Sequence, residues 1–64
     1  MMILEYRCMF NAYDGKGDVE YSRSNDAYQI VKDKAFVEEH LTNEKGICWL
    51  EIRRIEEWKR AEIK

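Results

Sequence analysis

Apolar and polar side chains alternate over residues 2–13, the pattern of a β-strand with one buried face. The apolar parity consists of Met2, Leu4, Tyr6, Cys8, Phe10 and Ala12. Residues 14–18 then bring together two glycines and two acidic turn formers, so a tight reversal is expected there. Alternation resumes over residues 19–23, with Val19 and Tyr21 inward. The two segments together predict a β-hairpin.

Residues 27–41 follow three consecutive N-cap types, Ser24-Asn25-Asp26, and carry apolar side chains at helical spacing. The predicted core stripe comprises Ala27, Tyr28, Ile30, Val31, Ala35, Val37 and Leu41. Lys34 and Glu38 are spaced as an i, i+4 ion pair. Phe36 lies opposite the stripe. Either it anchors in a partner's pocket or, the interpretation favoured here, a kink near Lys34 turns it inward.

Alternation returns over residues 47–53, where Cys48, Leu50 and Ile52 form the inward parity of a third strand. The phase slips after Arg54, and the charged residues 56–64 are predicted to form a short helical turn or a frayed tail. A single helix over residues 49–63 is the rival prediction, because most of these residues are good helix formers. The clean alternation favours the strand.

The predicted order is β-β-α-β in one small domain, residues 1–64. It gives an α+β two-layer sandwich, with one helix on a three-stranded antiparallel or mixed sheet of spatial order 2-1-3. One helix covers only one face of such a sheet, so the other face is open. The parity rule assigns ten residues to the open face: Ile3, Glu5, Arg7, Met9, Asn11, Glu20, Ser22, Trp49, Glu51 and Arg53.

Trp and Arg are enriched at binding hot spots, which makes the open face the candidate partner-binding site. Its predicted members are an exposed Trp49 anchor with Ile3 and Met9, the cations Arg7 and Arg53, and the acids Glu5 and Glu51. The face fits a larger protein or a second copy of the chain, and it also fits an ordinary half-exposed sheet surface. The edge strand over residues 19–23 is short and charged, as natural sheet edges often are.

The composition is that of a globular protein, with 64 residues, 45% apolar and 38% charged. A domain of this length buries only about 60% of its unfolded surface, so association would add useful burial. Eleven basic and 13 acidic side chains leave a formal charge of −2. No apolar run reaches the roughly 18 residues of a membrane helix, and the start does not read as a signal peptide, so no membrane partner is expected.

Cys8 and Cys48 are forty residues apart and lack a C-x-x-C motif. A disulfide or half of a metal site is possible, but two packed thiols in a reducing cytoplasm are the expectation, since both lie in apolar alternation. His40 is the single histidine, and a Cys–His pair needs an exposed thiolate. No catalytic, metal or cofactor site is therefore predicted.

A mixed basic and aromatic group is of the kind that binds nucleic acid: Trp49, Arg53, Arg54, Trp58, Lys59 and Arg60. Glutamates are interleaved with it, and phosphate binding relies on an excess of positive charge. The charge balance therefore argues against nucleic acid, which remains an alternative.

The proline-free composition rich in Lys, Glu, Asn and Tyr, the Met-Met start, and the order of strands and capped helix from Ile3 to Ile55 resemble small early proteins of tailed bacteriophages that inhibit host enzymes or toxins. The resemblance concerns size and layout and includes no motif, so it assigns no functional residue. It implies a cytoplasmic, non-enzymatic inhibitor that binds a larger host protein stoichiometrically. A homodimer is the alternative that uses the same face.

Overall fold

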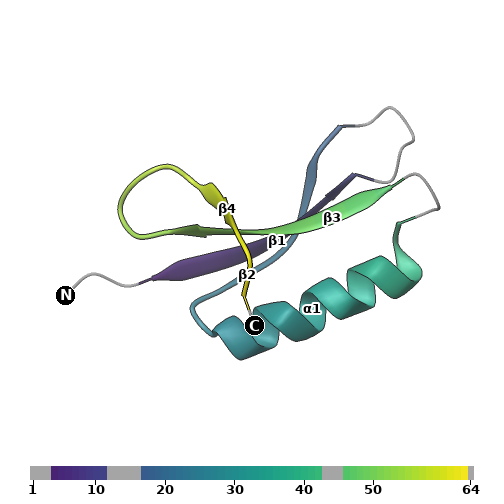
Figure 1. The fold of residues 1–64 in the computed structure, drawn as a ribbon, viewed down its shortest axis with the longest axis horizontal. Coiled ribbons are helices and arrows are strands. Elements are labelled where there is room, and N and C mark those ends of the chain that lie inside the picture. The colour runs from purple at the N-terminus through teal and green to yellow at the C-terminus, as the bar shows by residue number, and fades with distance from the viewer. Residues whose placement is uncertain (1–3, 12–16, 43–45, 64) are drawn as a thin grey trace.

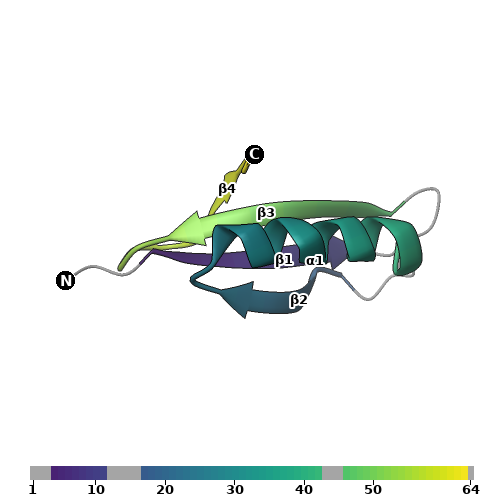
Figure 2. The same cartoon turned by 90° about the horizontal axis from the view of Figure 1, so that it is seen from below.

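A computed structural model describes residues 4–11, 17–42 and 46–63 of the chain (Figure 1). It contains β1 (Glu5–Asn11), β2 (Val19–Ser24), α1 (Ala27–His40), β3 (Ile47–Arg53) and β4 (Lys59–Ala61). The strands form an antiparallel sheet of order β2-β1-β3-β4, and α1 lies along one face (Figure 2). The predicted α+β class, the central first strand and the covering helix are confirmed. The predicted count of three strands is wrong.

The fourth strand is β4, in the segment predicted to be a helical turn or a tail. Its residues pair with Leu50, Glu51 and Ile52 of β3, which also rules out the rival helix over residues 49–63. The edge of β3 supplies backbone partners, and Ile63 beyond β4 packs against the core. Tertiary pairing thus overrides the weak local preferences of this charged segment.

The β1–β2 ladder shifts register between Cys8 and Met9, because Cys8 pairs with Ser22 while Met9 pairs with Glu20. Tyr21 is the additional residue of this bulge. Ser22 consequently lies on the helix side, where its hydroxyl donates to Asp33 Oδ2 at 2.7 Å. The prediction that Ser22 lies on the open face is therefore wrong.

The helix begins as predicted, with Asp26 as N-cap accepting from the backbone amides of Tyr28 and Gln29 at 3.0 and 3.4 Å. It buries Ile30 and Val37 against the sheet. The Lys34–Glu38 pair is confirmed at 2.9 Å. No helix in the described part of the chain is long and apolar enough to span a membrane.

Phe36 is 46% exposed on the continuous helix, so the predicted inward kink is wrong. Its ring stacks on Tyr21 of β2 at a centroid distance of 5.9 Å and contacts His40 at 4.6 Å. The buried cluster between α1 and the sheet consists of Cys8, Ile30, Val37 and Leu50.

Candidate functional site

The side of the sheet opposite α1 brings together six of the seven predicted site residues. They form three directly opposite pairs between β1 and β3: Glu5 with Arg53, Arg7 with Glu51, and Met9 with Trp49. Directly opposite residues have Cβ atoms roughly 5 Å apart, so their side chains interact. The seventh predicted residue, Ile3, lies outside the described residues.

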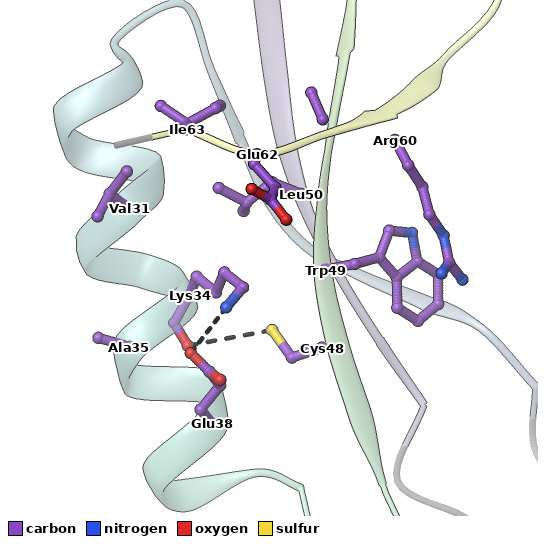
Figure 3. A pocket seen from close by; sticks show the side chains of 11 residues that line it. Val31, Lys34, Ala35, Glu38, Cys48, Trp49, Leu50, Arg60, Glu62 and Ile63 are labelled. Carbon is purple, nitrogen blue, oxygen red and sulfur yellow. Dashed lines mark hydrogen bonds and ion pairs between the residues drawn. The ribbon is translucent and has the colours of Figure 1, made fainter.

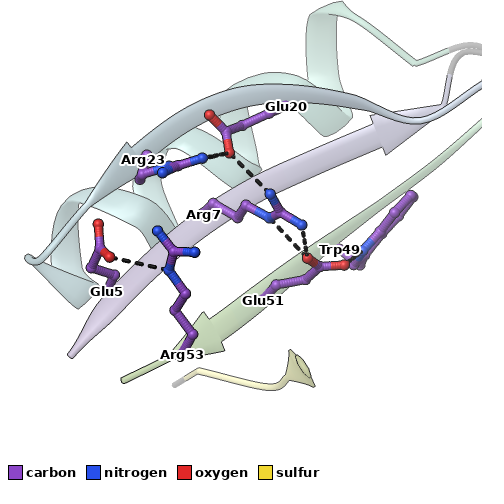
Figure 4. A network of polar contacts seen from close by, with 7 residues as sticks. All are labelled: Glu5, Arg7, Glu20, Arg23, Trp49, Glu51 and Arg53. Carbon is purple, nitrogen blue, oxygen red and sulfur yellow. Dashed lines mark hydrogen bonds and ion pairs between the residues drawn. The ribbon is translucent and has the colours of Figure 1, made fainter. Parts of the chain in front are cut away.

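Glu51 organises the centre of this face (Figure 4). Its Oε1 accepts from Arg7 Nε at 2.8 Å and from Arg7 Nη2 at 2.6 Å. Its Oε2 accepts from the Trp49 indole N–H at 2.8 Å. Burial raises the pKa of Glu51, but the hydrogen bonds from Trp49 and Arg7 outweigh it, so the pKa lies below its ordinary value.

Two further ion pairs extend the network across the sheet. Glu20 of β2 accepts from Arg23 Nη2 at 2.8 Å and from Arg7 Nη1 at 3.3 Å, and the Arg23 hydrogen bond is the main cause of its lowered pKa. At the other end, Arg53 Nε donates to Glu5 at 3.1 Å.

Trp58, which precedes β4, is the centre of a second set of contacts. The guanidinium carbons of Arg53 and Arg7 lie 4.3 and 4.4 Å from its ring centroid, and that of Arg23 lies 5.2 Å away. Arg60 of β4 lies 4.3 Å from the Trp49 ring. We call this surface the arginine–tryptophan face and define it by Arg7, Arg23, Arg53, Arg60, Trp49 and Trp58.

Trp49 and Met9 lie on this face but are only 9% and 8% exposed. The expectation of an outward-facing Trp49 anchor is therefore wrong. Arg60 from the unpredicted fourth strand lies over the indole, and Glu51 takes its N–H. Trp58 is half-buried and is the more accessible of the two indoles.

Arg23 and Trp58 were not among the predicted partner-binding residues. The signal that could have found Trp58 is the alternation of Lys59, Ala61 and Ile63 with Trp58 and Arg60, which continues the strand pattern beyond the phase slip. For Arg23 the parity argument failed because of the bulge at Tyr21.

The basic group considered for nucleic acid is brought together only in part. Trp49, Arg53 and Arg60 share the arginine–tryptophan face. Lys59 is directly opposite Ile52, so it lies on the helix side of the sheet and not on the arginine–tryptophan face. Arg54 is exposed in the turn between β3 and β4.

Both cysteines are free, and their sulfur atoms lie 3.7 Å apart. Burial raises the pKa of Cys8 to about 12 and also raises the pKa of Cys48. Both thiols therefore stay protonated at neutral pH and are weak nucleophiles. His40 contacts Phe36 and lies 3.9 Å from the Glu39 carboxylate.

A groove of about 690 Å³ lies between α1 and the strands β3 and β4 (Figure 3). Val31, Leu50 and Ile63 supply apolar lining, Cys48 faces it, and the Lys34–Glu38 pair lies at its helix side. Among the residues that the structure describes, no group of three or more His, Cys, Asp or Glu side chains is placed to hold a metal.

Comparisons of this chain with protein-family models, curated proteins and solved structures find no significant match. Function is therefore inferred from the geometry of the chain itself.

Proposed function

We propose that this protein is a non-enzymatic binding module that acts as a stoichiometric inhibitor of a larger protein through the arginine–tryptophan face. The observation that supports it is that the guanidinium groups of Arg7, Arg53 and Arg23 all lie within 5.2 Å of the centre of the Trp58 indole. Trp and Arg are the side chains that most often dominate binding energy.

Association normally costs about 0.5–1.5 kcal/mol for each flexible side chain that it immobilises. Here Arg7 and Arg23 are already restrained by Glu51 and Glu20, and both also contact Trp58. These two arginines therefore lose little further rotamer entropy when a partner binds this face. Free arginines on a disordered surface would not provide this advantage.

The Trp58→Ala variant is expected to lose the partner. Truncation of a hot-spot tryptophan costs about 2 kcal/mol or more, which is at least a thirtyfold loss of affinity. The measurement first captures the partner on the immobilised wild-type protein, from a lysate of cells that express the wild-type protein. The captured partner is then titrated with the wild type and with the variant. A melting curve establishes that the variant is folded.

Tyr28→Ala is the matched control, because Tyr28 is also aromatic and is 71% exposed on α1, away from the sheet. This variant is expected to bind within about twofold of wild type, as rim or non-interface residues do. Equal capture by folded Trp58→Ala and wild type would assign binding to another surface and overturn the proposal.

Self-association is a second candidate, through a surface other than the sheet face assigned to the predicted homodimer. It is favoured by the stacked rings of Tyr21 and Phe36, which are 40% and 46% exposed. The bulge at Tyr21 disfavours pairing through the β2 edge, so such a dimer would use the side chains. It predicts a melting midpoint that rises with protein concentration, and a Phe36→Ser variant that lacks this rise. A midpoint independent of concentration eliminates the dimer.

A further inference from the structure

Two arginines of the arginine–tryptophan face have both terminal nitrogens without an acceptor among the residues described. Arg7 differs because it donates from all three of its nitrogens, and Arg23 differs because it donates from Nε and Nη2, in each case to glutamates of the sheet. Arg53 donates only its Nε, to Glu5, which leaves both Nη groups without an acceptor among the residues described. Arg60 is exposed, and its guanidinium has no hydrogen bond or ion pair to the residues described, although its charge is close enough to lower the pKa of Glu51.

Each of these two guanidinium groups is nevertheless held in place. Arg53 lies 4.3 Å from the Trp58 ring and Arg60 lies 4.3 Å from the Trp49 ring. Contact with a large ring restrains a long side chain and leaves its N–H groups available. A guanidinium with free N–H groups is a planar fork that matches a carboxylate bidentately.

The two arginines project from backbone positions whose spacing an extended chain can match. Arg60 is opposite Glu51, and Arg53 lies two residues further along β3, so their Cα atoms are roughly 8 Å apart across adjacent strands. Alternate side chains of an extended peptide project from the same side about 6.5–7 Å apart. A glutamate at each such position would extend toward one of the two guanidinium groups, over Trp58 and over Trp49 respectively.

This side of the sheet is less acidic than the chain as a whole. Its described residues include four arginines, Arg7, Arg23, Arg53 and Arg60, against four carboxylates, Glu5, Glu20, Glu51 and Asp18, the last of which accepts from Asn11. The side is therefore neutral in a chain whose formal charge is −2. Acidic groups meet less repulsion here than on the rest of the molecule.

We propose that Arg53 and Arg60 form a carboxylate-binding site for an extended acidic segment of the partner, with acidic side chains at alternating positions. This inference rests on the proposed protein-binding function and specifies the chemistry of its partner.

The test is a titration of the whole protein with a short capped peptide of alternating glutamate and serine, followed by the fluorescence of Trp49 and Trp58. Binding is expected to change this emission, since each arginine lies on one of the indoles. Arg60→Gln is expected to weaken binding about tenfold, the loss of hydrogen bonds between charged groups. Arg60→Lys keeps the charge but not the fork, and is expected to weaken binding by less than Arg60→Gln.

Lys59→Gln is the matched control, because it removes the same charge from the neighbouring residue of β4 on the opposite parity. It is expected to bind within about twofold of wild type. If Lys59→Gln and Arg60→Gln weaken peptide binding equally, net charge alone explains the effect and the proposal is overturned. The proposal is also overturned if the peptide does not bind, or if a single-stranded oligonucleotide of similar length binds more tightly than the peptide.

The two proposals fail in different experiments. If partner capture depends on Trp58 but the acidic peptide does not bind, the protein-binding function stands and the acidic partner is wrong. If the peptide binds but capture is independent of Trp58, the carboxylate site stands and the proposed function is wrong.

Discussion

Trp49→Ala is expected to lower the free energy of unfolding by about 3–5 kcal/mol, the range for truncation of a buried aromatic side chain. The ring is 9% exposed, lies opposite Met9, is overlaid by Arg60 and donates its N–H to Glu51. A domain of this size has only about 3–5 kcal/mol of stability from its core. Urea denaturation followed by circular dichroism should therefore show the variant largely unfolded without denaturant.

Phe36→Ala is the control for this prediction, since its ring is also aromatic but 46% exposed. Loss of its stacking with Tyr21 is expected to cost about 1 kcal/mol, and the variant should remain folded. A Trp49→Ala protein that unfolds at the wild-type midpoint would contradict the buried position of the indole. If it does unfold, loss of partner binding by Trp49→Ala says nothing about the interface.

The elements that could be predicted from the sequence are those with strong local signals. Alternation over residues 47–53 and the Asp26 cap ahead of an apolar stripe require no knowledge of distant contacts. They led to the hairpin, the helix, the third strand and the pairing of β1 with β3. Parity alone placed six of the predicted site residues on one face, but the pairing of Arg7 with Glu51 depends on the register of β1 and β3, which parity does not give.

The features that were missed depend on contacts between distant segments. β4 contains Lys59, Arg60 and Ala61, whose local preferences do not specify a strand, and it exists because the edge of β3 accepts it. The bulge at Tyr21 changes parity by one residue and cannot be read from alternation in a single short strand. Arg23 lies on the open face because of this bulge.

The prediction that Trp49 is exposed was wrong for the same physical reason. Parity assigns a side chain to a face of the sheet, but burial depends on what else reaches that face. Trp58 and Arg60 come from beyond the phase slip and lie over β1 and β3. The surface predicted to be open is thus partly covered by the chain's own C-terminal segment, which supplies its more accessible indole.

Glu51→Gln is expected to destabilise the protein at neutral pH by about 1.5–3 kcal/mol, the range for hydrogen bonds to charged groups. The wild-type carboxylate accepts from both Arg7 and Trp49, whereas one end of a glutamine side chain is a donor and cannot serve both. The measurement is the free energy of unfolding from urea titrations at several pH values.

The same variant is expected to change how stability depends on pH. The folded pKa of Glu51 lies below its ordinary value, so the unfolded chain takes up this proton more readily. The stabilisation is complete above the unfolded pKa, about 4.3, and is lost as the pH falls through the lower folded pKa. Because glutamine does not titrate, the stability difference between wild type and Glu51→Gln should shrink with acidification.

Glu39→Gln is the matched control, because Glu39 is an exposed carboxylate at the end of α1. Its stability should stay within about 0.5 kcal/mol of wild type at every pH. A difference between wild type and Glu51→Gln that persists unchanged in acid would show that the charge of Glu51 does not matter. If the difference does shrink, one carboxylate both stabilises the fold and orients Arg7 toward Trp58, so acid should weaken folding and the proposed binding surface together.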